Sequence, residues 1–134
     1  FCDFDRNFSI GAPTPEVQSA HARLVDATAA GLAAAHPGAK VSDLFHAMNA
    51  VANPHGDTVN GGRLGHGLGM QLTEWPSIIQ ADRTELVPGM VLTLEPSVEL
   101  GTGKIMVHEE NILIRDTGPQ WLSTPQARDI RVLS

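Results

Sequence analysis

The sequence predicts an α+β fold in which helices cover one face of a mainly antiparallel sheet. The first observation is the order of the patterns, which is one strand, two helices and then several short strands. The second is size and composition, because 134 residues with 42% hydrophobic side chains suffice for one domain with a core. The third is the lack of any repeat or low-complexity tract, so we expect residues 1–134 to form a single domain.

The N-terminal part is predicted to hold a strand and a helix. Residues 1–10 alternate imperfectly and place three apolar side chains on one face, Phe4, Phe8 and Ile10. Thr14 followed by Pro15 is typical of a helix start, since threonine caps the free N–H groups and proline suits the first turn. The Ala-rich segment then continues to about His36, before Pro37-Gly38 ends it.

A second helix and a series of strands complete the pattern. The helix is predicted from its cap Ser42 to about Asn53, with an apolar face made of Leu44, Phe45, Met48 and Val51. Glu74-Trp-Pro76 is expected to close the first of the strands that follow, and Asp116-Thr-Gly118 is expected to form a hairpin turn. The predicted strands are 64–72, 90–94, 104–115, 120–123 and 129–133.

Charge and cysteine usage narrow the class of protein. The net charge is −6 with no cluster of lysine or arginine, so we expect no nucleic-acid partner. No apolar run approaches the roughly eighteen residues of a membrane span, so we expect no membrane partner. The single Cys2 rules out an internal disulfide and suits a reducing compartment, which favours a cytoplasmic protein.

One histidine and three acids stand in unusual surroundings. His66 lies in a glycine-rich stretch, and Asp3, Glu95 and Glu109 each lie in an apolar, strand-like context. A buried carboxylate is costly unless a cation neutralises it. Any one acid is equally compatible with a solvent-facing strand or turn residue, but the set of four favours a site for Mn²⁺, Fe²⁺, Co²⁺ or Zn²⁺. Carboxylates can also bridge two ions about 3.5–4 Å apart.

Four motifs carry a resemblance that covers nearly the whole chain. They are Cys2–Phe8 (CDFDRNF), Gly65–Gly69 (GHGLG) followed by EWP, Pro88–Pro96 (PGMVLTLEP) and Val107–Ile114 (VHEENILI). In this order and spacing the chain resembles the pita-bread metallohydrolases, which include creatinase, aminopeptidase P, prolidase and methionine aminopeptidase. The resemblance implies a curved sheet of two similar halves, of which this chain supplies the second, and it implies a homodimer acting on a small peptide or small-molecule substrate.

The resemblance also assigns roles by position. Asp3 and Glu109 match the carboxylates that bridge two metal ions, while His66 and Glu95 match the ligands of one ion. Glu95 further matches the residue that shuttles the proton. The family's aspartate for the second ion is expected about eleven residues before Asp3, upstream of Phe1, so the second ion is expected to be incompletely held here.

Specificity is where the sequence departs from the family pattern. The peptidases usually carry a histidine seven residues after the ligand histidine, where this chain has Thr73, and often another four residues before it, where this chain has Gly62. Thr73 can still donate a hydrogen bond to the substrate, and we assign it that catalytic and binding role. His55 is either a pocket residue or a solvated loop histidine.

Three functions are compatible with these departures. The first is hydrolysis of C–N bonds in Xaa-Pro peptides. The second is chemistry on a small substrate, like that of creatinase, ectoine hydrolase or dimethylsulfoniopropionate lyase. The third is a binding module that kept only the fold, which the intact set of ligands disfavours.

Overall fold

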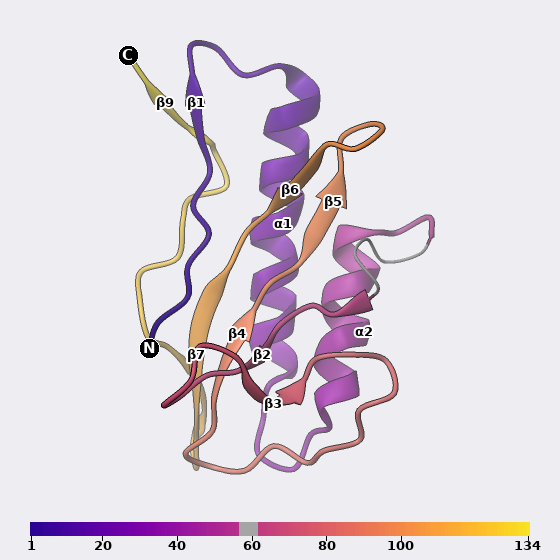
Figure 1. The fold of residues 1–134 in the computed structure, drawn as a ribbon, viewed down its shortest axis with the longest axis vertical. Coiled ribbons are helices and arrows are strands. Elements are labelled where there is room, and N and C mark those ends of the chain that lie inside the picture. Colours follow the sequence, from indigo (N-terminus) through magenta and orange to yellow (C-terminus); the bar gives the residue numbers. More distant parts are fainter. Residues whose placement is uncertain (57–61) are drawn as a thin grey trace.

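The computed structural model describes residues 1–56 and 62–134, and Figure 1 shows the course of the chain. In chain order its elements are β1 (Phe8–Ile10), α1 (Pro15–Ala34), α2 (Val41–Ala52), β2 (His66–Gly67), β3 (Glu74–Ser77), β4 (Val91–Leu94), β5 (Ser97–Glu99), β6 (Ile105–Val107), β7 (Glu110–Arg115), β8 (Gly118–Trp121) and β9 (Arg131–Leu133). None of the helices in these described ranges is long and apolar enough to cross a membrane.

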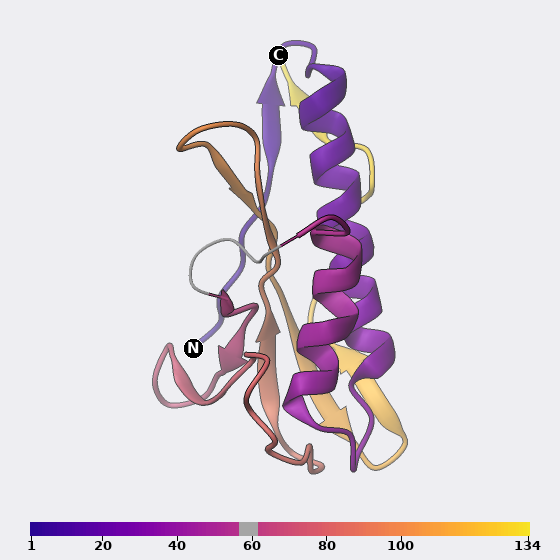
Figure 2. The ribbon, with the colours of Figure 1, turned by 90° about the vertical axis from the view of Figure 1, so that its right-hand side faces the viewer.

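Five strands form an antiparallel sheet in the order β3-β2-β4-β7-β8. The two helices lie beside each other along the strands, as Figure 2 shows. The core is the apolar layer between α2 and the sheet, and its largest fully buried members include Leu44, Met48, Leu92, Leu94, Ile112 and Ile114. The predicted α+β fold, with helices on an antiparallel sheet, is therefore confirmed.

The first helix begins as predicted. The Thr14 hydroxyl accepts a hydrogen bond from the Val17 N–H at 3.3 Å, and Pro15 occupies the first turn. The helix ends at Ala34, slightly before the predicted end, because Ala35 leaves the helical conformation to bond its N–H to Leu32. Its buried face includes Ala20, Leu24 and Ala27, small or slender side chains that let the neighbouring elements approach closely.

The second helix starts earlier than predicted. Its cap is Lys40 rather than Ser42, and the backbone N–H of Lys40 donates to the Asp43 carboxylate at 2.9 Å. This carboxylate therefore takes part in the cap, in place of the hydroxyl that was expected to do so. Ser42 instead lies buried in the first turn, where its hydroxyl accepts a hydrogen bond from Arg83.

The glycine-rich strand predicted at 64–72 shrinks to His66–Gly67. The register shifts between these two residues, and a separate strand, β3, contains the Glu74-Trp-Pro76 segment that was expected to end the first strand. The reason is tertiary, because β2 is held between β3 on one side and β4 on the other. The short strand places His66 in the interior of the sheet, between β3 and β4.

The strand predicted at 104–115 is divided between two sheets. β6 pairs with β5, whereas β7 pairs with β4 and β8. The chain changes sheets at His108 and Glu109, whose N–H groups bond to the carbonyls of Pro96 and Asp5 at 3.3 Å each. Glu109 therefore lies at a corner between the sheets and not within a regular strand.

The N-terminal strand is also shorter than predicted. Only Phe8–Ile10 pairs, in parallel with β9, and the three side chains expected to share an inward face are exposed, including Ile10 at 92%. The pair β1-β9 forms a sheet of only two strands, which leaves apolar side chains such as Ile10 uncovered within the described part of the chain. Residues 1–7 form no strand, and this segment contacts the corner at Glu109, whose N–H donates a hydrogen bond to the Asp5 carbonyl.

Candidate metal centre

His66 is held between β3 and β4 by the backbone around it. A Cβ at Gly65, whose φ is +136°, would collide with the Thr93 carbonyl, and one at Gly67 would collide with the Trp75 carbonyl. Only glycine therefore allows this close approach of strands. The His66 ring places Nδ1 at 2.9 Å from the Gly67 carbonyl oxygen, which leaves Nε2 free to face the acids.

Three carboxylates from separate parts of the chain converge on this nitrogen. His66 Nε2 lies 3.7 Å from Asp3 Oδ2 and 4.0 Å from Glu95 Oε2. One donor atom each from Asp3, His66 and Glu109 lie within 4.8 Å of one another. The structure thus brings together all four residues that the sequence singled out.

Each acid owes its place to a different local feature. Glu95 follows directly on β4, and Glu109 lies at the corner between β6 and β7. Asp3 has no strand to hold it, but its carbonyl accepts a hydrogen bond from the Asn111 amide at 2.6 Å, while its N–H donates back to Asn111 at 3.4 Å. Asn111 in β7 therefore fastens the N-terminal segment beside the sheet.

The pKa values in this group are governed by burial and by neighbouring negative charge, which outweigh the nearby cationic groups. Burial, and then the charges of Glu95, Asp3 and Asp5, raise the pKa of Glu109 to about 8. Burial also raises the pKa of Glu95, against the opposing effect of Arg63 and His66. Glu109 is 2% exposed, and among the described residues its Oε1 has no hydrogen-bond partner. A hard divalent cation would satisfy this oxygen and remove the repulsion, so the residues fit such an ion.

The sequence reasoning missed a fourth carboxylate, that of Asp5. One oxygen each from Asp5, Glu95 and Glu109 also lie within 4.8 Å of one another. The signal was present in the sequence, because residues two apart in an extended segment face the same side, and Asp5 stands two residues after Asp3. Glu109 is shared by both groups.

Glu110, in contrast, points away from this centre, as the strand alternation predicts. It accepts hydrogen bonds from Arg6 at 2.9 Å and from Ser123 at 3.0 Å. Burial acts to raise the pKa of Glu110, but His108 and Arg6 outweigh it and the pKa is lowered. Arg6 is therefore the ion-pair partner of Glu110 and not part of the metal centre.

The two predicted substrate residues lie at the surface. Thr73 is exposed in the loop that joins β2 and β3, and His55 is exposed just after α2. Neither belongs to the two groups of potential metal ligands. Their substrate roles stay predictions.

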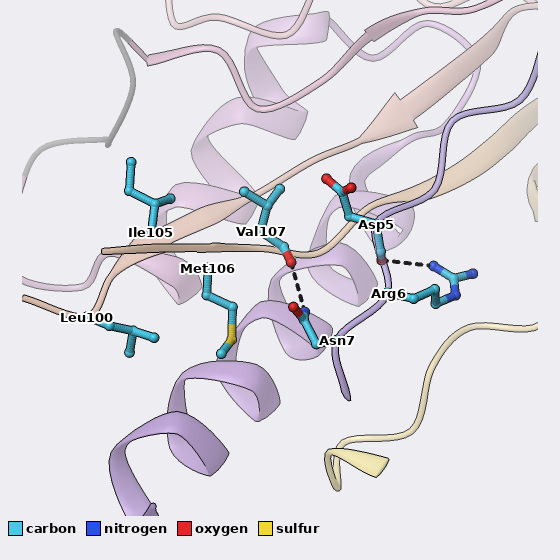
Figure 3. A pocket seen from close by; sticks show the side chains of 7 residues that line it. All are labelled: Asp5, Arg6, Asn7, Leu100, Ile105, Met106 and Val107. Atoms are coloured by element: carbon cyan, nitrogen blue, oxygen red, sulfur yellow. Dashed lines mark hydrogen bonds between the residues drawn. The ribbon is translucent and has the colours of Figure 1, made fainter. Parts of the chain in front are cut away.

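Two hollows adjoin the acids. A cavity of about 220 Å³ is lined by Arg63, Glu95, Ser97 and Val107. A second, of about 330 Å³, shares Val107 with the first and is drawn in Figure 3; it is lined by Asp5, Arg6, Asn7, Leu100, Ile105, Met106 and Val107. The smaller cavity therefore has both an arginine, Arg63, and a carboxylate, Glu95, in its lining.

Comparisons with known proteins agree with this geometry. An Xaa-Pro dipeptidase of Pyrococcus furiosus is 30% identical over 125 residues, which cover 90% of this chain and 35% of that protein. The X-Pro aminopeptidase from Thermotoga maritima matches the structure with a TM-score of 0.85 at 27% identity, over 98% of this chain and 38% of that one. Dipeptidase PepE from Mycobacterium ulcerans gives a TM-score of 0.86 at 26% identity, over 98% and 35%.

The chain therefore spans little more than a third of the length of these proteins. The pita-bread fold expected from the motifs is confirmed by the two structural matches. The sequence pattern of metallopeptidase family M24 matches residues 1–116, which is most of the chain. The chain belongs to metallopeptidase family M24.

Proposed function

We propose that this chain forms part of the active site of a metal-dependent hydrolase of C–N bonds that acts on short peptides, in the manner of an Xaa-Pro dipeptidase. The observation that carries the proposal is the buried His66, with Nε2 at 3.7–4.0 Å from two carboxylates and beside the buried Glu109. Membership of a metallopeptidase family and the likeness to an Xaa-Pro dipeptidase support it.

In this proposal Asp3, His66, Glu95 and Glu109 hold the metal. An imidazole with carboxylates suits Mn²⁺, Co²⁺, Fe²⁺ or Zn²⁺, and Asp3 and Glu109 are the acids placed to bridge two ions. When bound, such ions lower the pKa of a water molecule and polarise a carbonyl. Glu109 contributes to metal affinity chiefly because it is buried, since an ionised carboxylate at a buried position is stable only beside a cation.

Glu95 is the group that we assign to proton transfer. Its side chain is about one-quarter exposed, so it reaches both the buried histidine and the cavity lined by Arg63 and Ser97. Burial raises its pKa toward neutrality, which is the direction that a general base near pH 7 requires. Glu95 accepts the proton of the attacking water and delivers it to the nitrogen of the leaving amine.

Thr73 and His55 are proposed to contact the substrate. Thr73 lies in the exposed loop after β2, from which its hydroxyl can donate a hydrogen bond to a substrate carbonyl. Threonine carries no positive charge, so it stabilises a developing oxyanion less than a protonated histidine does.

This substitution favours a second candidate function. A relative that acts on a small substrate other than a peptide, as creatinase, ectoine hydrolase or dimethylsulfoniopropionate lyase does, has less need of the peptidase histidine at the Thr73 position. The same metal residues and the same Glu95 serve both candidates. The nature of the substrate is therefore the property that separates them.

The test combines metal analysis with a substrate panel on the gene product that carries this sequence. Metal per chain is measured after dialysis with Mn²⁺, Co²⁺ or Zn²⁺, and the loaded protein is assayed with Xaa-Pro dipeptides and with a panel of osmolytes and guanidino compounds. Release of proline supports the first function, and turnover of the panel alone supports the second. A protein that takes up no metal under any of these conditions contradicts both.

A further inference from the structure

Asp5 belongs to a second group of oxygen donors beside the one centred on His66. One oxygen each from Asp5, Glu95 and Glu109 lie within 4.8 Å of one another. Oxygen ligands about 2.1 Å from a shared ion lie at most about 4.2 Å apart, so shifts of a few tenths of an ångström bring this group to bonding distances. The spacing is therefore compatible with a shared ion, although spacing alone is also common among exposed acids, so the assignment of a metal site depends on the buried member, Glu109.

Glu109 supplies independent support. Its side chain is 2% exposed, and Oε1 has no hydrogen-bond partner among the described residues. A buried carboxylate oxygen without a donor is costly, and the group that best satisfies it is a cation. Because Glu109 is common to both donor groups, it is placed to bridge two ions.

The backbone of Asp5 is held in position for this role. Its carbonyl oxygen accepts hydrogen bonds from the Glu109 N–H at 3.3 Å and from Arg6 Nη1 at 3.2 Å. These bonds fix Asp5 against the residue with which it shares the donor group. In Figure 3 the carboxylate of Asp5 points away from the side chains of Arg6 and Asn7.

The guanidinium of the neighbouring Arg6 forms its bonds with groups other than the Asp5 carboxylate. Arg6 Nη2 lies 2.9 Å from Glu110 Oε2, and Arg6 Nη1 donates to the Glu109 carbonyl at 2.7 Å. The guanidinium is therefore committed to the opposite side of the segment. The carboxyl groups of Asp5, Glu95 and Glu109 face one another, and an added divalent ion would stabilise their ionised forms.

We propose that Asp5 is a metal ligand of this protein, which together with Glu109 helps to hold a second ion beside the ion held by His66 and Glu95. The inference rests on the proposed function, since it concerns the same metal centre. It goes further by adding a carboxylate from this segment to the second ion. Asp5 then contributes to the affinity for that ion, whatever else completes its coordination.

The experiment is a titration of the metal-free gene product with MnCl₂ by calorimetry, together with the visible absorption of CoCl₂ added stepwise. Asp5→Asn keeps the size of the side chain and removes its charge. Asp116→Asn is the matched control, because Asp116 is exposed in the turn between β7 and β8. Thermal melts of the metal-free variants check that each folds like the unsubstituted protein.

The expected result is that Asp5→Asn weakens one of two binding steps by at least about tenfold and alters the cobalt absorption of that step. The other step is unchanged, and Asp116→Asn behaves like the unsubstituted protein. If Asp5→Asn kept two binding steps with the affinities of the unsubstituted protein, the assignment of Asp5 would be overturned, and the metal centre itself would not. Absence of any binding by the unsubstituted protein would overturn the metal centre itself, and with it the proposed function.

Discussion

Replacing Glu109 with glutamine is expected to abolish the pH dependence that this buried acid imposes on the stability of the metal-free protein. Its pKa rises from 4.5 to about 8 on folding, chiefly through burial. Between these pH values the folded state binds one proton more than the unfolded state, so the free energy of unfolding falls as the pH rises. One pKa unit is worth about 1.4 kcal/mol, and the shift therefore removes about 5 kcal/mol by pH 9.

Glutamine cannot ionise, so Glu109→Gln lacks this loss. The two proteins should be about equally stable near pH 4, where the glutamate is protonated in both states. By pH 9 the variant should exceed the unsubstituted protein by up to about 5 kcal/mol, which is a large part of a typical domain stability. Bound divalent metal should restore the unsubstituted protein at high pH and help the variant less.

The assay is urea unfolding in EDTA, followed by tryptophan fluorescence at several pH values between 4 and 9. Titrating groups outside this cluster act equally in both proteins, so the difference between them reports Glu109 together with the acids coupled to it, Glu95, Asp3 and Asp5. Glu99→Gln is the control, because Glu99 is exposed at the end of β5, and its effect should stay within about 0.5 kcal/mol. A difference between Glu109→Gln and the unsubstituted protein that does not change with pH would refute the reasoning.

Three further changes test the rest of the structure. Gly67→Ala should cost about 3 kcal/mol or more in denaturant unfolding, because its Cβ collides with a strand carbonyl, whereas Gly56→Ala should cost little, as nothing lies within 4 Å of that position. Arg6→Gln should cost up to about 3 kcal/mol at pH 7 by removing the arginine charge from the buried Glu110 carboxylate, which keeps its hydrogen bonds from Ser123 and Gln126. Since the pKa of Glu110 is lowered on folding, its stabilising contribution is lost as the pH falls, and the Arg6→Gln penalty should shrink in acid; an unchanged penalty at pH 3 would contradict this. Mn²⁺ at a hundredfold excess over its Kd should stabilise the protein by about 2.7 kcal/mol in thermal melts, and His66→Ala should lose most of that gain.

Local signals in the sequence were sufficient for the helices and for the choice of metal residues. Thr14 and Pro15 determine where α1 begins, since capping depends on residues within one turn of the chain. Asp3, His66, Glu95 and Glu109 stood out because a carboxylate in an apolar segment needs a cation wherever that segment lies. The structure brings these four side chains together.

The course of the strands could not be predicted in the same way. The apolar run at 104–115 is continuous in sequence, yet the chain changes sheets at His108 because Pro96 and Asp5 compete for the backbone there. The cap of α2 passed from Ser42 to Lys40 for a similar reason, since Arg83 engages the serine hydroxyl. Both outcomes depend on residues far away in the chain.

The sequence by itself determined the family, the helices and the four residues that face one another at the centre. Only the tertiary structure decided that Arg6 serves Glu110, over a separation of 104 residues, and that Asp5 joins Glu95 and Glu109. The physical reason is that residue type and short-range spacing fix what a side chain needs, namely a cap, a core or a cation. Which partner meets that need depends on how distant segments pack, and no local pattern encodes it.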